Sequence, residues 1–168
     1  MEGRSGVNHP CQTGRVIVRL AREQDIPAFV ELAARVEHWF GPMVEDPGFH
    51  RAVLNNIRRG TALVAASGPN RLGGLLFGVR RAPIYHVRWL AVSESERGVG
   101  VGRALISDAL RRFVRAPATI EVITFGLGHP AATGARAFYE SLGFTPAEAA
   151  ASGPEGGPRQ VFRRKVSA

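Results

Sequence analysis

The segment 97–103 reads Arg-Gly-Val-Gly-Val-Gly-Arg, so three glycines alternate with valines between two arginines. An apolar run at 89–92 precedes this segment, and helical periodicity follows it from 103 to 115. Glycines at a strand-to-helix junction leave the main chain uncovered, so several N–H groups can converge on one bulky anion. The positive end of the helix dipole adds to the attraction. The pattern predicts a pyrophosphate site, although a glycine-rich turn without a ligand would read the same way.

Two familiar phosphate-binding patterns do not fit this glycine loop. A Walker loop requires a lysine after its glycines, and the chain has no lysine before Lys165. A dinucleotide fingerprint would place Arg103 in its third glycine position, and no acidic residue follows at the end of a second strand. The pattern that remains is Arg-x-x-Gly-x-Gly, formed by Arg97, Gly100 and Gly102.

A second motif lies downstream, where residues 135–144 read Ala-Arg-Ala-Phe-Tyr-Glu-Ser-Leu-Gly-Phe. With both motifs in this order, the sequence resembles the GNAT superfamily of acyl-CoA-dependent N-acetyltransferases, over residues 84–144 above all. That family has the first motif after its fourth strand and an Ala-x-x-x-Tyr-x-x-x-Gly-Phe helix end. The resemblance implies a single α/β domain with a mixed, mostly antiparallel sheet. One parallel pair of strands is splayed apart in it, and helices cover both faces.

The same resemblance implies an activity. It predicts transfer of an acetyl group from acetyl-CoA to a primary amine by direct attack in a ternary complex. A non-catalytic acyl-CoA-binding sensor or regulatory module is the alternative. Acyl transfer from a thioester needs no metal. The histidines are dispersed, and neither a His-x-x-x-His pattern nor a pair of cysteines occurs, so no metal site is expected.

Three residues are expected to perform the chemistry. The resemblance makes Tyr139 the general acid for the leaving thiolate, and it assigns the oxyanion to the backbone N–H of Leu90. His86 stands where several relatives carry an acidic general base, and imidazole titrates in the right range for that role. Strand alternation predicts that residues 86, 88 and 90 face the same way. A packed strand histidine and a core tyrosine are the alternative readings.

The pantetheine arm would add to the strand edge that the splay exposes, and the pyrophosphate would reach the glycine loop. Many relatives carry an asparagine where this chain has Ala132, and Thr133 is the nearest substitute. The residues expected to bind acetyl-CoA are Leu90, Ala91, Val92, Arg97, Gly98, Val99, Gly100, Val101, Gly102, Arg103 and Thr133.

By resemblance, the first two helices and their connection wall the acceptor site. The expected substrate-binding residues are His38, Trp39, Glu45, Asp46 and His129. The two acids would pair with an ammonium, and Trp39 would face it through a cation–π contact. Solvated loop acids and a core tryptophan are the alternative. The acceptor is a small-molecule or peptide amine, and a homodimer is compatible with the sequence.

Composition narrows the class of protein. A chain of 168 residues with 45% hydrophobic residues suits one globular domain, expected at 15–168 after a flexible tail at 1–14. The net charge of +8 is spread over scattered arginines without a nucleic-acid-binding motif, which favours a phosphorylated cofactor over nucleic acid. No apolar run has the length of a membrane span. Cys11 is the only cysteine, which fits a reducing cytoplasm.

Periodicity and turn residues predict the remaining elements. Strands are expected at 15–20, 61–66, 71–80, 84–92, 119–125 and 161–166. Helices are expected at 26–40, 47–59, 101–114 and 131–142. The Ala-, Pro- and Gly-rich segment 145–160 is interpreted as a mobile connection between two closing strands.

Overall fold

A computed structural model of the chain describes residues 15–154 and 156–168. The strands are β1 (Ile17–Leu20), β2 (Ala62–Ser67), β3 (Asn70–Arg81), β4 (Ile84–Val92), β5 (Ala118–Phe125), β6 (Thr145–Ala150) and β7 (Arg159–Val166). The helices are α1 (Ile26–Phe40), α2 (Pro47–Arg59), α3 (Val101–Phe113) and α4 (Ala132–Ser141), with short 3-10 turns η1 (Glu23–Asp25) and η2 (Glu94–Glu96). The tail predicted at 1–14, with Cys11, lies outside the described residues.

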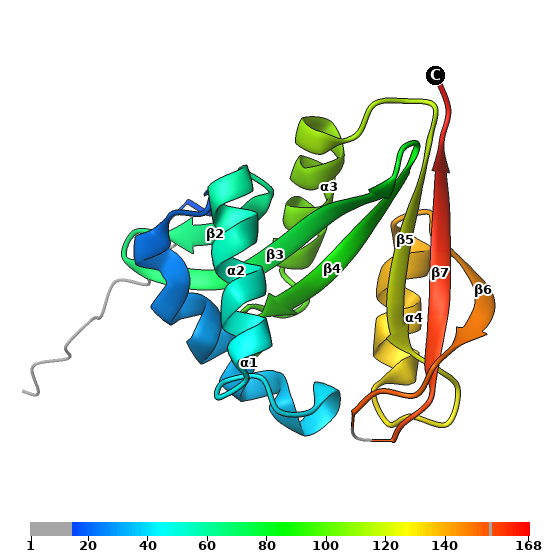
Figure 1. The fold of residues 1–168 in the computed structure, drawn as a ribbon, viewed down its shortest axis with the longest axis horizontal. Coiled ribbons are helices and arrows are strands. Elements are labelled where there is room, and N and C mark those ends of the chain that lie inside the picture. The colour runs from blue at the N-terminus through cyan, green and yellow to red at the C-terminus, as the bar shows by residue number, and fades with distance from the viewer. Residues whose placement is uncertain (1–14, 155) are drawn as a thin grey trace, which may run out of the picture.

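The strands form one sheet in the order β1-β2-β3-β4-β5-β7-β6. The pair β4–β5 is parallel, and the other neighbouring pairs are antiparallel. Helices α1 and α2 lie on one face, and α3 and α4 lie on the other (Figure 1). The mixed, mostly antiparallel sheet that the resemblance implied is confirmed.

Strand β2 shows how the sheet separates two apolar cores. Leu63 and Ala65 belong to the larger core cluster with the inward face of α3. Ala62 and Val64 alternate with them and pack in a second cluster with α1 and α2. Because successive side chains of a strand point to opposite faces, a nearly continuous apolar run such as this one suits a strand covered on both sides.

The segment 145–160 differs in part from its interpretation as a connection. Strand β6 occupies residues 145–150, so the segment that joins β6 to β7 is shorter than expected. This strand pairs with the outer edge of β7, from Thr145↔Arg163 to Ala150↔Arg159. Half of its residues are alanine and all of them are exposed or half-buried, so no apolar alternation marks it.

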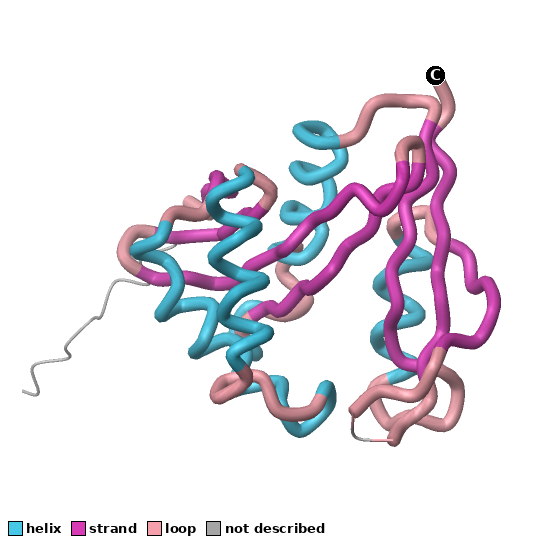
Figure 2. The backbone as a smooth tube through the Cα atoms, in the orientation of Figure 1, coloured by secondary structure: helices cyan, strands magenta, loops and turns pink. Residues whose placement is uncertain are grey.

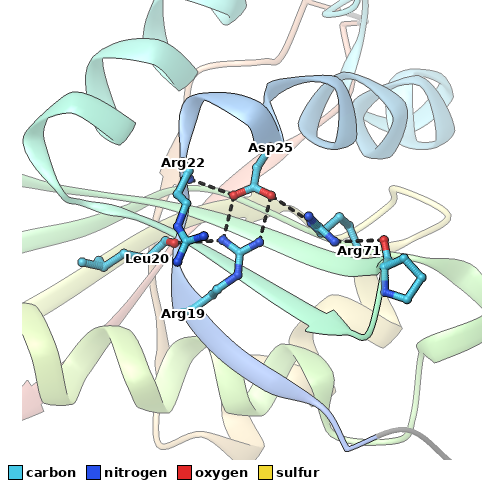
Figure 3. Close-up of polar contacts among 6 residues, drawn as sticks. Arg19, Leu20, Arg22, Asp25 and Arg71 are labelled. Atoms are coloured by element: carbon cyan, nitrogen blue, oxygen red, sulfur yellow. Dashed lines mark hydrogen bonds and ion pairs between the residues drawn. The ribbon is translucent and has the colours of Figure 1, made fainter.

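Asp25 ties the first strand to the hairpin between β2 and β3 (Figure 3). Its carboxylate accepts hydrogen bonds from Arg19 at 2.8 and 3.0 Å, from Arg71 Nε at 2.8 Å and from the Arg22 N–H at 2.8 Å. Burial alone would raise the pKa of Asp25, but these donors outweigh it and hold the pKa well below its usual range. We call Asp25, Arg19 and Arg71 the N-terminal clamp.

Candidate functional site

Strands β4 and β5 pair over four positions only, from Ile84↔Thr119 to Val87↔Val122. Beyond Val87, β4 continues on β3 and β5 continues on β7. Figure 2 shows the two strands together at one end and far apart at the other. The predicted splay is therefore confirmed, and it leaves a gap along the last residues of β4.

The direction of the backbone N–H groups of β4 follows from one hydrogen bond. The N–H of Ser93 donates to the carbonyl of Leu72 on β3 at 2.8 Å. Because N–H groups alternate sides along a strand, that of Ala91 also points toward β3. Those of Leu90 and Val92 point into the gap. Of the three β4 residues expected to bind acetyl-CoA, two therefore offer an N–H there, and Ala91 does not.

A β-bulge at Arg88 changes which side chains share a face. Consecutive residues of β3 pair with Val87 and Trp89, so Arg88 is an extra residue in β4. Val87 and Leu90 accordingly both pack on the α3 side, while Trp89 packs against α1 and α2. The prediction that residues 86, 88 and 90 face the same way is wrong, because the bulge shifts the alternation. His86 faces the α1 and α2 side, opposite to Leu90.

The glycine loop runs from η2 into α3. Gly98 and Gly100 have φ of 78° and 90°, a conformation that residues with a Cβ rarely adopt. Gly100 is the N-cap of α3 and provides no side-chain hydrogen bond to the first turn. The first N–H groups of α3 are thus left for another acceptor. Arg97 is exposed beside them, and Val99 is 66% exposed.

Gly102 has a different role in the same loop. A Cβ at this position would lie 3.0 Å from the ring of Phe138 and 3.6 Å from Val92. The missing side chain lets Phe138, on α4, pack against the start of α3. Arg103 ties the same two helices together, since its guanidinium donates to the hydroxyl of Ser141 at 3.1 Å. The Arg103 side chain is thereby directed to the end of α4.

Tyr139 belongs to α4, and its side chain points into the core, so the residue is only 6% exposed. Its ring contacts Phe138, Phe144 and Phe162 at centroid distances of 4.9, 5.6 and 6.2 Å. Burial raises the pKa of its phenol well above the usual range. Tyr139 and Leu90 belong to the same apolar cluster. Tyr139 is buried within this cluster, and Leu90 is partly buried against it.

Thr133 is exposed at the first turn of α4. It lines a cavity of about 250 Å³ together with Phe125 of β5 and Gln160 and Phe162 of β7. Ala132 beside it is buried.

A cluster of rings joins α1 to the far side of the gap. Trp39 and His129 lie 5.6 Å apart, and the rings of Phe125 and His129 stack at 4.2 Å. Phe40 packs on Phe125 at 4.6 Å, and the Arg159 guanidinium lies 5.2 and 4.8 Å from these two rings. We call these five residues the aromatic bridge. The sequence predicted Trp39 and His129 at the acceptor site but carries no local signal that would have placed Phe125 and Arg159 beside them.

The other residues expected at the acceptor site lie at the end of α1 and in the α1–α2 connection. His38 is exposed and packs on Trp39 at 4.5 Å. Glu45 is exposed, and Asp46 caps α2 by accepting the N–H of Gly48 at 2.9 Å. Glu37 was not expected here. It accepts the N–H groups of residues 43 and 44, which fixes the start of the connection.

Within the described ranges, no group of three or more His, Cys, Asp or Glu residues is arranged to hold a metal ion. None of the described helices combines the length and the apolarity that crossing a membrane requires.

Comparisons with known proteins agree with this geometry. A sequence model of the family described as "Acetyltransferase (GNAT) domain" matches residues 58–146. A search among curated proteins finds no significant match.

Solved structures show the same fold at low sequence identity. Ard1 from Thermoplasma volcanium superposes with a TM-score of 0.73 at 16% identity, covering 91% of this chain and 99% of that chain. The PaiA N-acetyltransferase from Thermoplasma acidophilum, solved with coenzyme A, gives 0.70 at 14%, with coverages of 90% and 99%. The ribosomal-protein-S18-alanine N-acetyltransferase from Escherichia coli gives 0.67 at 18%, with coverages of 92% and 96%. With its split sheet, its glycine loop and a family match over more than half of its length, this chain belongs to the GNAT family of acetyltransferases.

Proposed function

We propose that the chain transfers an acetyl group from acetyl-CoA to a primary amine by direct attack in a ternary complex. The observation that carries this proposal is the short pairing of β4 and β5, which opens a gap beside the glycine loop. The N–H groups of Leu90 and Val92 point into that gap. Such a gap suits a thin arm that carries amides and ends in a pyrophosphate.

Binding of acetyl-CoA would use the backbone of this chain at two places. Val92 would donate its N–H to an amide carbonyl of the pantetheine arm, as an added strand does. The N–H groups of Val101, Gly102 and Arg103 would hold the pyrophosphate at the start of α3. The exposed guanidinium of Arg97 would add positive charge beside it.

His86 would remove the proton that the attacking amine must lose. An alkylammonium has a pKa of about 10.4, so only a small fraction is nucleophilic at neutral pH. A base therefore speeds the reaction. A neutral imidazole can accept this proton, directly or through a water.

Groups on the other face of the gap would stabilise the tetrahedral intermediate and protonate the leaving group. The N–H of Leu90 would donate to the oxyanion. As the C–S bond breaks, its electron pair leaves with sulfur, and Tyr139 would donate its hydroxyl proton to that thiolate. Burial holds the pKa of Tyr139 high, so the phenol remains protonated at any working pH. Tyr139 is therefore unsuited to be the base, and its hydroxyl proton is in place when the thiolate forms.

The acceptor would enter from the side of α1, past Trp39, His38 and His129. Glu45 remains the candidate partner for an ammonium, whereas Asp46 is engaged as a helix cap. One structural neighbour is a ribosomal-protein-S18-alanine N-acetyltransferase, and another was solved with the bisubstrate analogue CoA-Ac-MVNAL. The substrates in these names are those of the two neighbouring proteins. They make peptide N-termini one acceptor class to test alongside small amines.

The test is release of free thiol from acetyl-CoA across a library of small amines and peptide N-termini, with calorimetric binding of acetyl-CoA measured in parallel. Release with at least one acceptor supports the transferase. Binding without release over the whole library favours the acyl-CoA sensor. Absence of binding rejects the proposed site itself.

A further inference from the structure

Three titratable side chains lie in one row across β4, β5 and β7, next to the point where the gap opens. The register pairs His86 with Glu121 and Glu121 with Arg163. We call His86, Glu121 and Arg163 the cross-strand row. Its first pair lies one residue before Val87↔Val122, the last pair that joins β4 to β5.

The row faces the side from which the acceptor would enter. The residues before and after His86, and those before and after Glu121, all belong to the core cluster with α3. Because side chains alternate along a strand, His86 and Glu121 point to the opposite face. Partners across a parallel pair stand about 4.8 Å apart. The two side chains therefore leave the sheet from neighbouring positions on the same face, and Phe125 of the aromatic bridge follows farther along β5 on that face.

Glu121 is largely withdrawn from water. Its side chain is 12% exposed, and Arg163 Nε lies 3.6 Å from its Oε1. On its outer side Arg163 also donates to Glu148 of β6 at 2.5 Å, and Glu148 is 57% exposed. A shielded carboxylate acts on its neighbours more strongly than a solvated one, because less water screens it. The charge of Glu121 is placed to act on His86.

On the opposite side His86 borders Gly78, its register partner in β3. A Cβ at Gly78 would lie 3.3 Å from His86 Cε1 and 2.9 Å from Arg88 Cδ. The glycine thus makes room for the imidazole and for the stem of Arg88 at the bulge. His86 lies between β3 and β5. The residue beside it on β5, Glu121, can therefore influence the orientation of its ring.

We propose that Glu121 is a positioning residue for His86. This proposal rests on the proposed function, in which His86 is the base. As the new N–C bond forms, the proton of the amine moves to a ring nitrogen of His86. Glu121 takes no proton itself. Its carboxylate fixes the orientation and tautomer of the ring and stabilises the imidazolium that forms, and Arg163 holds the carboxylate in place.

The first experiment compares turnover in matched variants. Glu121→Gln keeps the shape of the side chain and removes its charge. We expect kcat to fall about 10- to 100-fold, no more than the smallest usual contribution of the base itself, with the KM for acetyl-CoA unchanged. Glu121→Asp should recover part of the loss. Glu148→Gln, which also removes a partner of Arg163 but lies beyond the row, should keep wild-type turnover. Equal kcat in Glu121→Gln and wild type would overturn the proposal.

The second experiment does not depend on turnover, so it separates this proposal from the proposed function. Nitrogen-15 NMR at pH 8.5 reports the tautomer of the neutral His86 ring, with the signal assigned by its loss in His86→Gln. We expect the tautomer ratio to change in Glu121→Gln and to stay the same in Glu148→Gln. An unchanged ratio in Glu121→Gln would refute the positioning role. If the ratio changes but the protein acetylates no amine, the positioning of His86 by Glu121 is supported and the proposed acetyltransferase activity is rejected.

Discussion

The β1 side of the sheet and the β4–β5 junction are held together by different means. On the β1 side, one buried carboxylate receives donors from β1, from the turn before α1 and from β3, so three segments are fastened at one point. At the junction itself, four register pairs and the aromatic bridge join β4 and α1 to β5 and β7. The N-terminal clamp consists of charged hydrogen bonds, whereas the gap is bordered by backbone groups left for a ligand. We therefore expect changes at the clamp to affect stability and changes at the gap to affect activity.

Asp25→Ala should have the largest effect on free energy. It leaves two guanidinium groups without their shared carboxylate, and we expect the free energy of unfolding to fall by about 3 kcal/mol. Urea denaturation measures this. Glu23→Ala is the control, because Glu23 and its partner Arg58 are both mostly exposed and such a pair contributes about 1 kcal/mol or less. The folded fraction of Asp25→Ala should bind acetyl-CoA normally, and a weaker affinity would contradict the separation of the two regions.

Tyr139→Phe tests the gap. We expect kcat to fall about 100-fold or more, with nearly unchanged affinity for acetyl-CoA and unchanged stability, because only the donor hydroxyl is lost. Steady-state thiol release measures kcat, and calorimetry measures the affinity for acetyl-CoA. Tyr85→Phe is the matched control in the same core cluster, and it should retain turnover. If Tyr139→Phe turns over like wild type, the acid lies elsewhere.

Gly100→Val should affect both properties. A β-branched residue at φ of 90° is strained by about 1–3 kcal/mol, and its side chain would cover the first N–H groups of α3. We expect acetyl-CoA affinity to fall at least tenfold. Gly68→Val places comparable strain in the β2–β3 turn, where φ is 56°. It should lower stability and leave affinity intact. Equal loss of affinity in both variants would attribute the effect to strain alone.

The pH dependence of stability should show the clamp in the wild-type protein. Since the pKa of Asp25 is depressed in the folded state, its contribution is complete above its unfolded pKa of about 3.9. It is lost as the pH falls below that value toward the folded pKa. Urea titrations should show this contribution constant from pH 7 to 5 and declining below pH 4. Asp25→Asn should flatten that decline, and an identical decline in the variant would assign it to other groups.

Local patterns predicted most of the fold because its elements carry strong signals. The strand at 84–92 and the helix at 47–59 appear with the predicted bounds, since Gly60 and the apolar periodicity mark them. β6 was missed because alanines on an exposed edge give no periodicity. For the site, the sequence offered the glycine loop and Tyr139 as candidates, but it put His86 and Leu90 on the same face, because nothing local announces a bulge at Arg88.

The sequence by itself determined the class of the protein. The alternating glycines of the loop and the tyrosine one helical turn before Gly143 are local sequence patterns. They can therefore be recognised without knowing the rest of the fold. Tertiary structure alone decided that His86 stands beside Glu121 and that Arg159 lies over Phe125. The reason is physical. Cross-strand neighbours are selected by register, and register depends on how all strands bury their apolar faces together, which no short stretch of sequence specifies.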